Sequence, residues 1–130
     1  MTDAPLIPVS WGEAIDKLTI LEIKATRLTE KAGLANVQSE LALVRETTSL
    51  VLGLYPDAVS LAARLKTVNE RLWDIEDAIR AKEAAKDFGE EFITLARAVY
   101  TTNDERARLK RQINILLSSP LSEEKSYRPY

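Results

Sequence analysis

The stretch LAARLKTVNERLWDIEDAI, residues 61–79, decides the fold class. Its apolar side chains recur at alternating intervals of four and three residues, at Leu61, Leu65, Val68, Leu72, Ile75 and Ile79. This spacing places them along one side of an α-helix, which is typical of a helix that packs against other helices. No segment of the chain shows the alternating pattern of a strand, so the sequence predicts an all-α protein.

Before this helix, the segment SWGE at residues 10–13 marks the start of another. Ser10 and Glu13 have the spacing of a capping box, so we predict Ser10 as the N-cap of a helix that continues to about Leu28. Gly33 is the predicted end of this region, because glycine commonly follows the last turn of a helix. A second helix is predicted over residues 34–52.

Further helix boundaries are predicted by proline, aspartate and threonine. Pro56 suits the first turn of the third helix, and Asp87, followed by Glu90, is the predicted N-cap of a fourth. The segment YTTNDER, residues 100–106, leaves two alternatives. Either Thr102 begins a fifth helix, or one long helix continues to about residue 117 with Thr102 buried.

The expected architecture is a single domain over residues 1–130, an antiparallel bundle of four helices, or five if residues 101–104 break the last one. Residues 1–9 form an N-terminal extension, residues 10–117 form the bundle, and residues 118–130 form a polar tail.

The composition excludes several classes of function. The chain contains no cysteine and no histidine, which excludes disulfides, thiolate catalysis and the Ser–His type of nucleophilic site. Its net charge of −2 gives no attraction to nucleic acid. There is no secretory signal and no apolar stretch long enough for a membrane span, so we expect a soluble cytoplasmic protein. We expect no cofactor, and we interpret the acidic row Glu70, Asp74 and Asp77 as a solvated helix surface rather than a metal site.

One carboxylate falls on the predicted core side of the first helix. Glu22 needs a partner there, because a lone buried charge is costly. Arg106 lies on the apolar side of the last helix, and a guanidinium can bind a carboxylate through two hydrogen bonds. We therefore predict a Glu22–Arg106 pair, either as a structural ion pair or, together with Asn103 and Lys110, as a site for a small anion.

A second group of residues predicts an interface. Asn69, Trp73, Glu76 and Arg80 recur at intervals of four and three, and Trp and Arg are favoured at protein interfaces. Glu76 and Arg80 have the spacing of a helical ion pair. Ile20 and Ile23 point away from the main apolar side of the first helix, which indicates that this helix is sandwiched or meets another subunit in a homodimer. Tyr127 adds an aromatic side chain in the tail.

The blocks VSWGEAIDKLTILEIKATRL, LANVQSEL, LWDIEDAIR, FITLARAVYTTNDERARLKRQIN and EEKSYRPY together resemble a family of small all-helical bacterial proteins that is known only as a domain of unknown function. The similarity covers about residues 9–130. It implies a bacterial cytoplasmic protein and an association with surface-polysaccharide or glycosyl-transfer systems. The family's typical residues here are Glu22, Lys24, Asn36, Trp73, Glu76, Asp77, Arg80, Asn103, Arg106, Lys110, Asn114, Glu123, Lys125 and Tyr127.

A weaker resemblance links AIDKLTILEIKATR, residues 14–27, to the first helix of all-helical chorismate mutases. Those enzymes bind a dicarboxylate with cationic side chains, a role that would fall here to Lys24, Arg27, Arg106 and Lys110. However, the spacing from Asp16 to Arg27 is shorter than in that family, and Arg27 points away from the core side.

Two functional hypotheses follow. The first is a non-enzymatic helical bundle that binds a protein partner or a second copy of itself, as an accessory to a surface-polysaccharide system. The alternative is a small-anion-binding protein or enzyme with a Glu/Arg/Lys site in the bundle.

Overall fold

The computed structural model describes residues 2–130, and these form four α-helices and no strand. The helices are α1 (Trp11–Arg27), α2 (Lys31–Leu54), α3 (Pro56–Ala84) and α4 (Glu90–Leu116). The predicted all-α class is therefore confirmed. Helix α4 runs without a break through Thr102, which is only 6% exposed, so the alternative with a fifth helix is excluded.

Two of the three predicted helix caps differ from the structure. Ser10 caps α1 as predicted, because its hydroxyl accepts the backbone N–H of Glu13 at 3.1 Å. The prediction that Gly33 ends a helix is wrong. The carboxylate of Glu30 accepts the backbone N–H groups of Ala32 and Gly33, at 3.1 and 2.8 Å, and α2 begins at this acidic cap.

The predicted cap of α4 is wrong by two residues. Gly89 occupies the N-cap position, and Asp87 accepts the backbone N–H of Gly89 at 3.2 Å from outside the helix. The aspartate therefore organises the turn that precedes α4 rather than the first turn itself. Pro56, in contrast, lies in the first turn of α3 as predicted.

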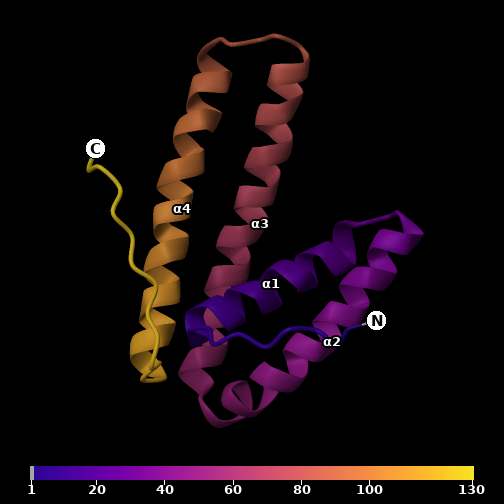
Figure 1. The fold of residues 1–130 in the computed structure, drawn as a ribbon. Coiled ribbons are helices and arrows are strands. Elements are labelled where there is room, and N and C mark those ends of the chain that lie inside the picture. Colours follow the sequence, from indigo (N-terminus) through magenta and orange to yellow (C-terminus); the bar gives the residue numbers. More distant parts are fainter. Residues whose placement is uncertain (1) are drawn as a thin grey trace.

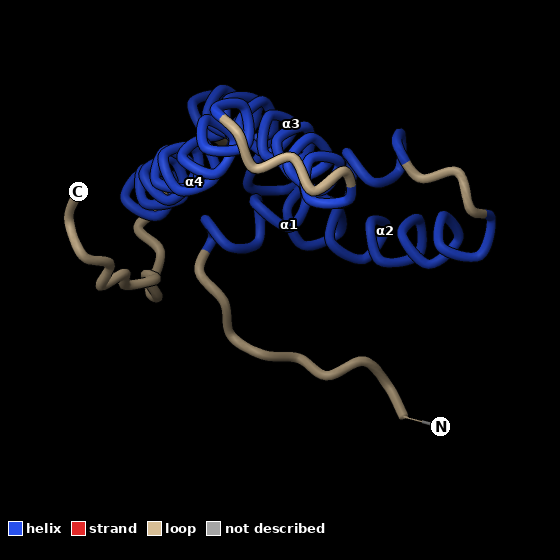
Figure 2. The backbone as a smooth tube through the Cα atoms, turned by 90° about the horizontal axis from the view of Figure 1, so that it is seen from above, coloured by secondary structure: helices blue, strands red, loops and turns tan. Residues whose placement is uncertain are grey.

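The helices are arranged as two crossing pairs. Figure 1 shows α3 and α4 as a long antiparallel pair, whose lower part is crossed by α1 with α2 beside it. Helix α1 packs against all three others, whereas α2 packs against α1 and α3 and, within residues 2–130, makes no contact with α4. The view from above in Figure 2 shows the N-terminal segment extending away from the helices and the tail lying on the side of α4.

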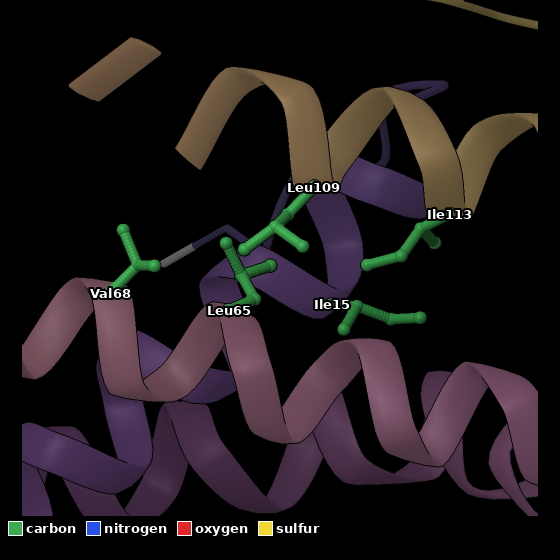
Figure 3. Packing of buried hydrophobic residues seen from close by; sticks show 5 residues of the cluster. All are labelled: Ile15, Leu65, Val68, Leu109 and Ile113. Carbon is green, nitrogen blue, oxygen red and sulfur yellow. The ribbon is translucent and has the colours of Figure 1, made fainter. Parts of the chain in front are cut away.

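The main core lies where α1 crosses the α3–α4 pair. Figure 3 shows Ile15 of α1 between Leu65 and Val68 of α3 and Leu109 and Ile113 of α4, all of them at most 2% exposed. Full burial of such side chains stabilises the fold by about 1.5–3 kcal/mol each. A second cluster joins α1 to α2 and consists of Leu18, Leu21, Val37 and Leu41.

The upper part of the α3–α4 pair, residues 76–101, lies beyond α1 and is called the arm below (Figure 1). No residue of the arm is buried, whereas every buried residue that the structure describes lies in residues 10–75 and 102–116, called the base. Ile75 is the last buried residue before the arm, and Thr102 is the first buried residue after it. A two-helix arm has no third element to cover its sides, so its apolar residues stay half-exposed or exposed.

Candidate functional site

A buried ion pair joins α1 to α4 in the base. The side chain of Asp16 is 2% exposed and that of Arg106 is 26% exposed. Nε of Arg106 donates to Oδ1 of Asp16 at 3.0 Å, and Nη2 donates to Oδ2, so the two groups meet through a bidentate contact. This hydrogen bonding to Asp16 raises the pKa of Arg106 above its ordinary value and outweighs the opposing effect of burial.

Three further polar side chains complete this pair. The amide nitrogen of Asn69 donates to Oδ1 of Asp16 and to the hydroxyl of Thr19, at 2.9 Å in both cases. Nη1 of Arg106 donates to the side-chain oxygen of Asn103 at 3.3 Å. In residues 2–130 no buried side-chain polar atom lacks a partner. The network is therefore satisfied, which is the condition under which a buried ion pair is tolerated.

The predicted Glu22–Arg106 pair is wrong. The Glu22 carboxylate lies instead near Arg45 of α2 and Lys66 of α3, at 3.5 and 3.9 Å, and its side chain is 29% exposed. Asp16 precedes Glu22 by six residues and so lies on a different side of α1. The sequence contained a signal for this partner, because Asp16 shares its side of the helix with Ile20 and Ile23, the second apolar row.

Lys110 forms a separate contact between α1, α4 and the tail. Its side chain is 8% exposed, and its ammonium group donates to Glu13 at 2.8 Å and to Glu123 at 2.7 Å. Burial acts to lower the pKa of Lys110, but the hydrogen bonds to Glu123 and Glu13 outweigh it and the pKa is raised. The hydrogen bonds from Lys110 and Lys125 lower the pKa of Glu123 to about 2. Lys110 is thus occupied by protein carboxylates.

A close helix crossing at Gly12 was not predicted from the sequence. The backbone N–H of Gly12 donates to the side-chain oxygen of Asn114 at 2.6 Å. A Cβ atom at this position would lie 2.4 Å from the carbonyl oxygen of Lys110, so only glycine allows α1 to approach α4 this closely. The sequence signal was a glycine inside the first turn of a predicted helix.

Two cavities meet at Arg106. The first, about 430 Å³, lies between α1 and α3, and the second, about 710 Å³, lies between α3, α4 and the tail. Leu72, Glu76 and Arg106 line both cavities. We call these two cavities together the cleft. Its volumes are in the range of small-molecule sites in proteins.

The fold brings the predicted interface residues together around this cleft. Six of them line the smaller cavity, and Tyr127 lines the larger one; the six are Ile20, Ile23, Asn69, Trp73, Glu76 and Arg80. Ile23 and Asn69 are buried, at 2% and 6% exposed, so they form the floor of the cleft and are not free for a partner. The burial of Ile23 also confirms that α1 is sandwiched between other helices.

The rim of the cleft carries charged and aromatic groups. The predicted Glu76–Arg80 ion pair is confirmed at 3.2 Å. The guanidinium carbon of Arg27 lies 5.7 Å from the ring centroid of Trp73, and Arg27 also donates to Asp74 at 2.6 Å. Half-buried Trp73 is therefore held in place beside the opening.

The predicted anion-binding residues do not form one site. Asn103 and Arg106 line the larger cavity, but Glu22 faces Arg45 and Lys66, and Lys110 faces Glu13 and Glu123. No group of three or more acidic side chains in residues 2–130 is placed to hold a metal ion. Within the same residues no helix has the length and apolar content that crossing a bilayer requires. The arrangement is that of an open cleft whose floor includes Ile23, Asn69 and the paired Arg106.

Comparisons with known proteins identify the chain at the level of a family. Searches of the curated proteins and of the solved structures found no match. A model of one protein family, described as a family of unknown function (DUF6165), matches residues 6–129. Because this match covers nearly the whole chain, the protein belongs to the DUF6165 family.

Proposed function

We propose that this protein is a non-enzymatic helical bundle that binds another protein through its arm, and that the first partner is a second copy of the chain. The observation that carries the proposal is the absence of any buried residue in the arm, residues 76–101. Because no residue of this helical pair is buried, its apolar residues stay exposed or half-exposed.

The exposed apolar residues of the arm follow from its two-helix construction. Phe88 and Ile93 are 51% and 54% exposed. Phe92, Leu95 and Val99 are only half-buried. Clustered apolar surface of this kind is typical of interfaces rather than of solvated surfaces.

A second copy of the chain supplies what the arm lacks. Two arms that pack side by side form a four-helix bundle, in which each pair covers an open side of the other. A stable interface buries about 800 Å² per partner. This area requires the contact to extend beyond the arm, and half-buried Trp73 is available next to it at the rim of the smaller cavity.

The chemistry of the base supports a non-enzymatic role. The two cations that were candidates for an enzymatic site are already paired with protein carboxylates. Arg106 is paired with Asp16, and Lys110 is paired with Glu13 and Glu123. The chain also lacks histidine and cysteine, the usual base and thiol nucleophile at neutral pH. The association with surface-polysaccharide or glycosyl-transfer systems, in a bacterial cytoplasm, stays a prediction from the family resemblance.

The experiment measures the molar mass of the protein in solution by size-exclusion chromatography with light scattering, over a range of concentrations. We expect about twice the chain mass of 14.6 kDa at high concentration. Ile93→Asp places a charge on the arm and should give the mass of one chain. The matched control is Leu43→Asp, on the surface of α2, where the leucine is 58% exposed.

The control should behave like the wild type, because Leu43 lies outside the arm. A single-chain mass for the wild type at every concentration would contradict the proposal. So would a dimer that Ile93→Asp leaves intact.

A further inference from the structure

The larger cavity of the cleft has a wall made by the C-terminal tail. Tyr127 and Tyr130 line it opposite α4, and the ring of Tyr130 meets the edge of the Tyr100 ring with centroids 5.0 Å apart. The hydroxyl of Tyr130 donates to Oδ2 of Asp104 at 2.5 Å. The tail therefore forms one side of the cavity and contacts α4 through Tyr130.

The cavity contains hydrogen-bond donors that the protein does not use. Arg106 has five N–H donors, of which its contacts with Asp16 and Asn103 use three. Asn103 accepts with its oxygen, and its amide nitrogen has no acceptor in residues 2–130. Arg128 lines the same cavity and forms no hydrogen bond or ion pair through its side chain with the described residues.

The cavity also contains carboxylates with one oxygen free. Oε2 of Glu76 accepts from Arg80 at 3.2 Å, and Oδ2 of Asp104 accepts from Tyr130. No donor in residues 2–130 binds the other oxygen of either group. The polar lining is thus balanced, since free donors and free carboxylate oxygens are both present.

The rest of the lining is apolar. Leu72 and Val99 contribute aliphatic surface from the two long helices, and Pro129 contributes it from the tail, next to the tyrosine rings. A ligand that complements this lining has an apolar body and also pairs with both kinds of polar group.

We propose that the larger cavity binds an apolar or aromatic α-amino acid, as the free zwitterion. Its carboxylate accepts from Arg128, Asn103 and the unused N–H groups of Arg106. Its ammonium group donates to Glu76 and Asp104. Its side chain packs between Leu72, Val99 and the tyrosine rings. A simple anion would be repelled by Glu76 and Asp104 and would leave their free oxygens without a donor. A simple cation would leave Arg128 and the unused N–H groups of Arg106 without an acceptor.

The test uses the full-length protein and isothermal titration calorimetry. The probes are L-phenylalanine, L-tyrosine, L-tryptophan and L-leucine, with two analogues of phenylalanine that each lack one charge. These analogues are 3-phenylpropionate, which has no ammonium group, and phenethylamine, which has no carboxylate. We expect at least one amino acid to bind, and both analogues of phenylalanine to bind at least tenfold more weakly than phenylalanine itself.

Two variants locate the site. Arg128→Gln should weaken amino-acid binding at least tenfold without changing the thermal midpoint, because Arg128 is exposed and unpaired in residues 2–130. Arg64→Gln, at an exposed arginine of α3 outside both cavities, is the matched control and should bind as the wild type does. Glu76→Gln should weaken binding of the amino acid but not of 3-phenylpropionate.

Ile93 lines neither cavity, so Ile93→Asp should leave the affinity unchanged even where it changes the molar mass. Binding of no amino acid at millimolar concentration would overturn the proposal. Equal affinity for phenylalanine and either analogue would overturn it too, and so would full affinity in the Arg128→Gln variant.

Discussion

The base and the arm are built from the same two helices, yet their side chains are packed differently. In the base, α3 and α4 contribute residues such as Leu65 and Ile113, both 0% exposed, to a core shared with α1. In the arm, the same helices still carry apolar residues, such as Ile79 of α3 and Leu95 of α4, but bury none of them. The difference is the presence of α1, because an apolar side chain of α3 or α4 is covered from all sides only where α1 crosses the pair.

The arm is held instead by contacts of low energy. Lys82 lies 3.2 Å from Asp87 and 2.5 Å from Glu91, and these hydrogen bonds, the one to Glu91 first, raise the pKa of Lys82. Exposed ion pairs of this kind contribute little to stability, because water and salt screen the charges. Helix continuity and burial are therefore separate properties, because α3 and α4 continue through the arm without burying any of its residues.

The largest effect is expected where the base buries charge. Asp16→Asn leaves Arg106 without its counter-ion, and breaking a buried pair from one side costs about 3–5 kcal/mol. The matched variant in the same helix, Glu22→Gln, removes a carboxylate whose ion pairs are partly exposed and should cost about 1 kcal/mol or less. Urea denaturation of both variants measures the difference. Equal losses would show that the Asp16 network is not what holds α1 to α4.

The next effect tests the close crossing of α1 and α4. Gly12→Ala forces the two helices apart and should destabilise the protein by about 1–3 kcal/mol or more. Gly53→Ala is the control, because a Cβ atom at Gly53 meets nothing within 4 Å. Alanine in that exposed helical position should stabilise the protein by about 0.5–1 kcal/mol. Thermal denaturation should therefore give shifts of opposite sign, and two shifts of the same sign would count against the geometry described.

A smaller effect concerns how the tail is attached to the base. The folded-state pKa of Glu123, about 2, is below its ordinary value of 4.5. Its stabilising contribution is therefore fully present above about pH 4.5 and is lost as the pH falls towards 2. Because the Glu123 side chain is 37% exposed, solvent screening limits the effect to under about 1 kcal/mol.

The measurement for this prediction is the difference in unfolding free energy between the wild type and Glu123→Gln, followed from pH 7 downwards. The difference should shrink as the acid range is entered. A difference that stays constant down to pH 2 would show that Glu123 does not titrate with the tail contact.

The smallest effect lies at the tip of the arm. Lys86 has a φ of 55°, in the left-handed region, immediately after α3 ends. Lys86→Gly removes the strain of a side chain in this conformation and should stabilise the protein by under about 1 kcal/mol. The gain in unfolding free energy should be smaller still if the arm unfolds before the base, because Lys86 then no longer affects the unfolding of the base. Chemical denaturation measures it, and a loss of stability would contradict the assigned turn.

Sequence patterns predicted the elements that depend on local rules. The spacing of Leu65, Val68 and Leu72 predicted α3, and Ser10 and Pro56 predicted two helix starts. The errors at Gly33 and Asp87 arose because short polar residues and glycine serve several roles near helix ends, and the neighbouring chain decides which one applies.

The site was predicted in part, because a pattern within one helix says nothing about which side of another helix it meets. Asn103, Arg106 and the row from Asn69 to Arg80 were singled out, and the fold gathers them around one cleft. The partner of Arg106 was assigned to Glu22 instead of Asp16, since both carboxylates lie on apolar rows of α1. Only the crossing of α1 over α4 distinguishes them.

Hydrogen exchange of the arm, followed by mass spectrometry at low and high protein concentration, tests the central claim most directly. We predict that amides in residues 76–101 become more protected as the concentration rises, that those around Leu109 and Ile113 do not change, and that Ile93→Asp abolishes the concentration dependence. Protection of the arm that is the same at every concentration, and unaffected by Ile93→Asp, would contradict the account.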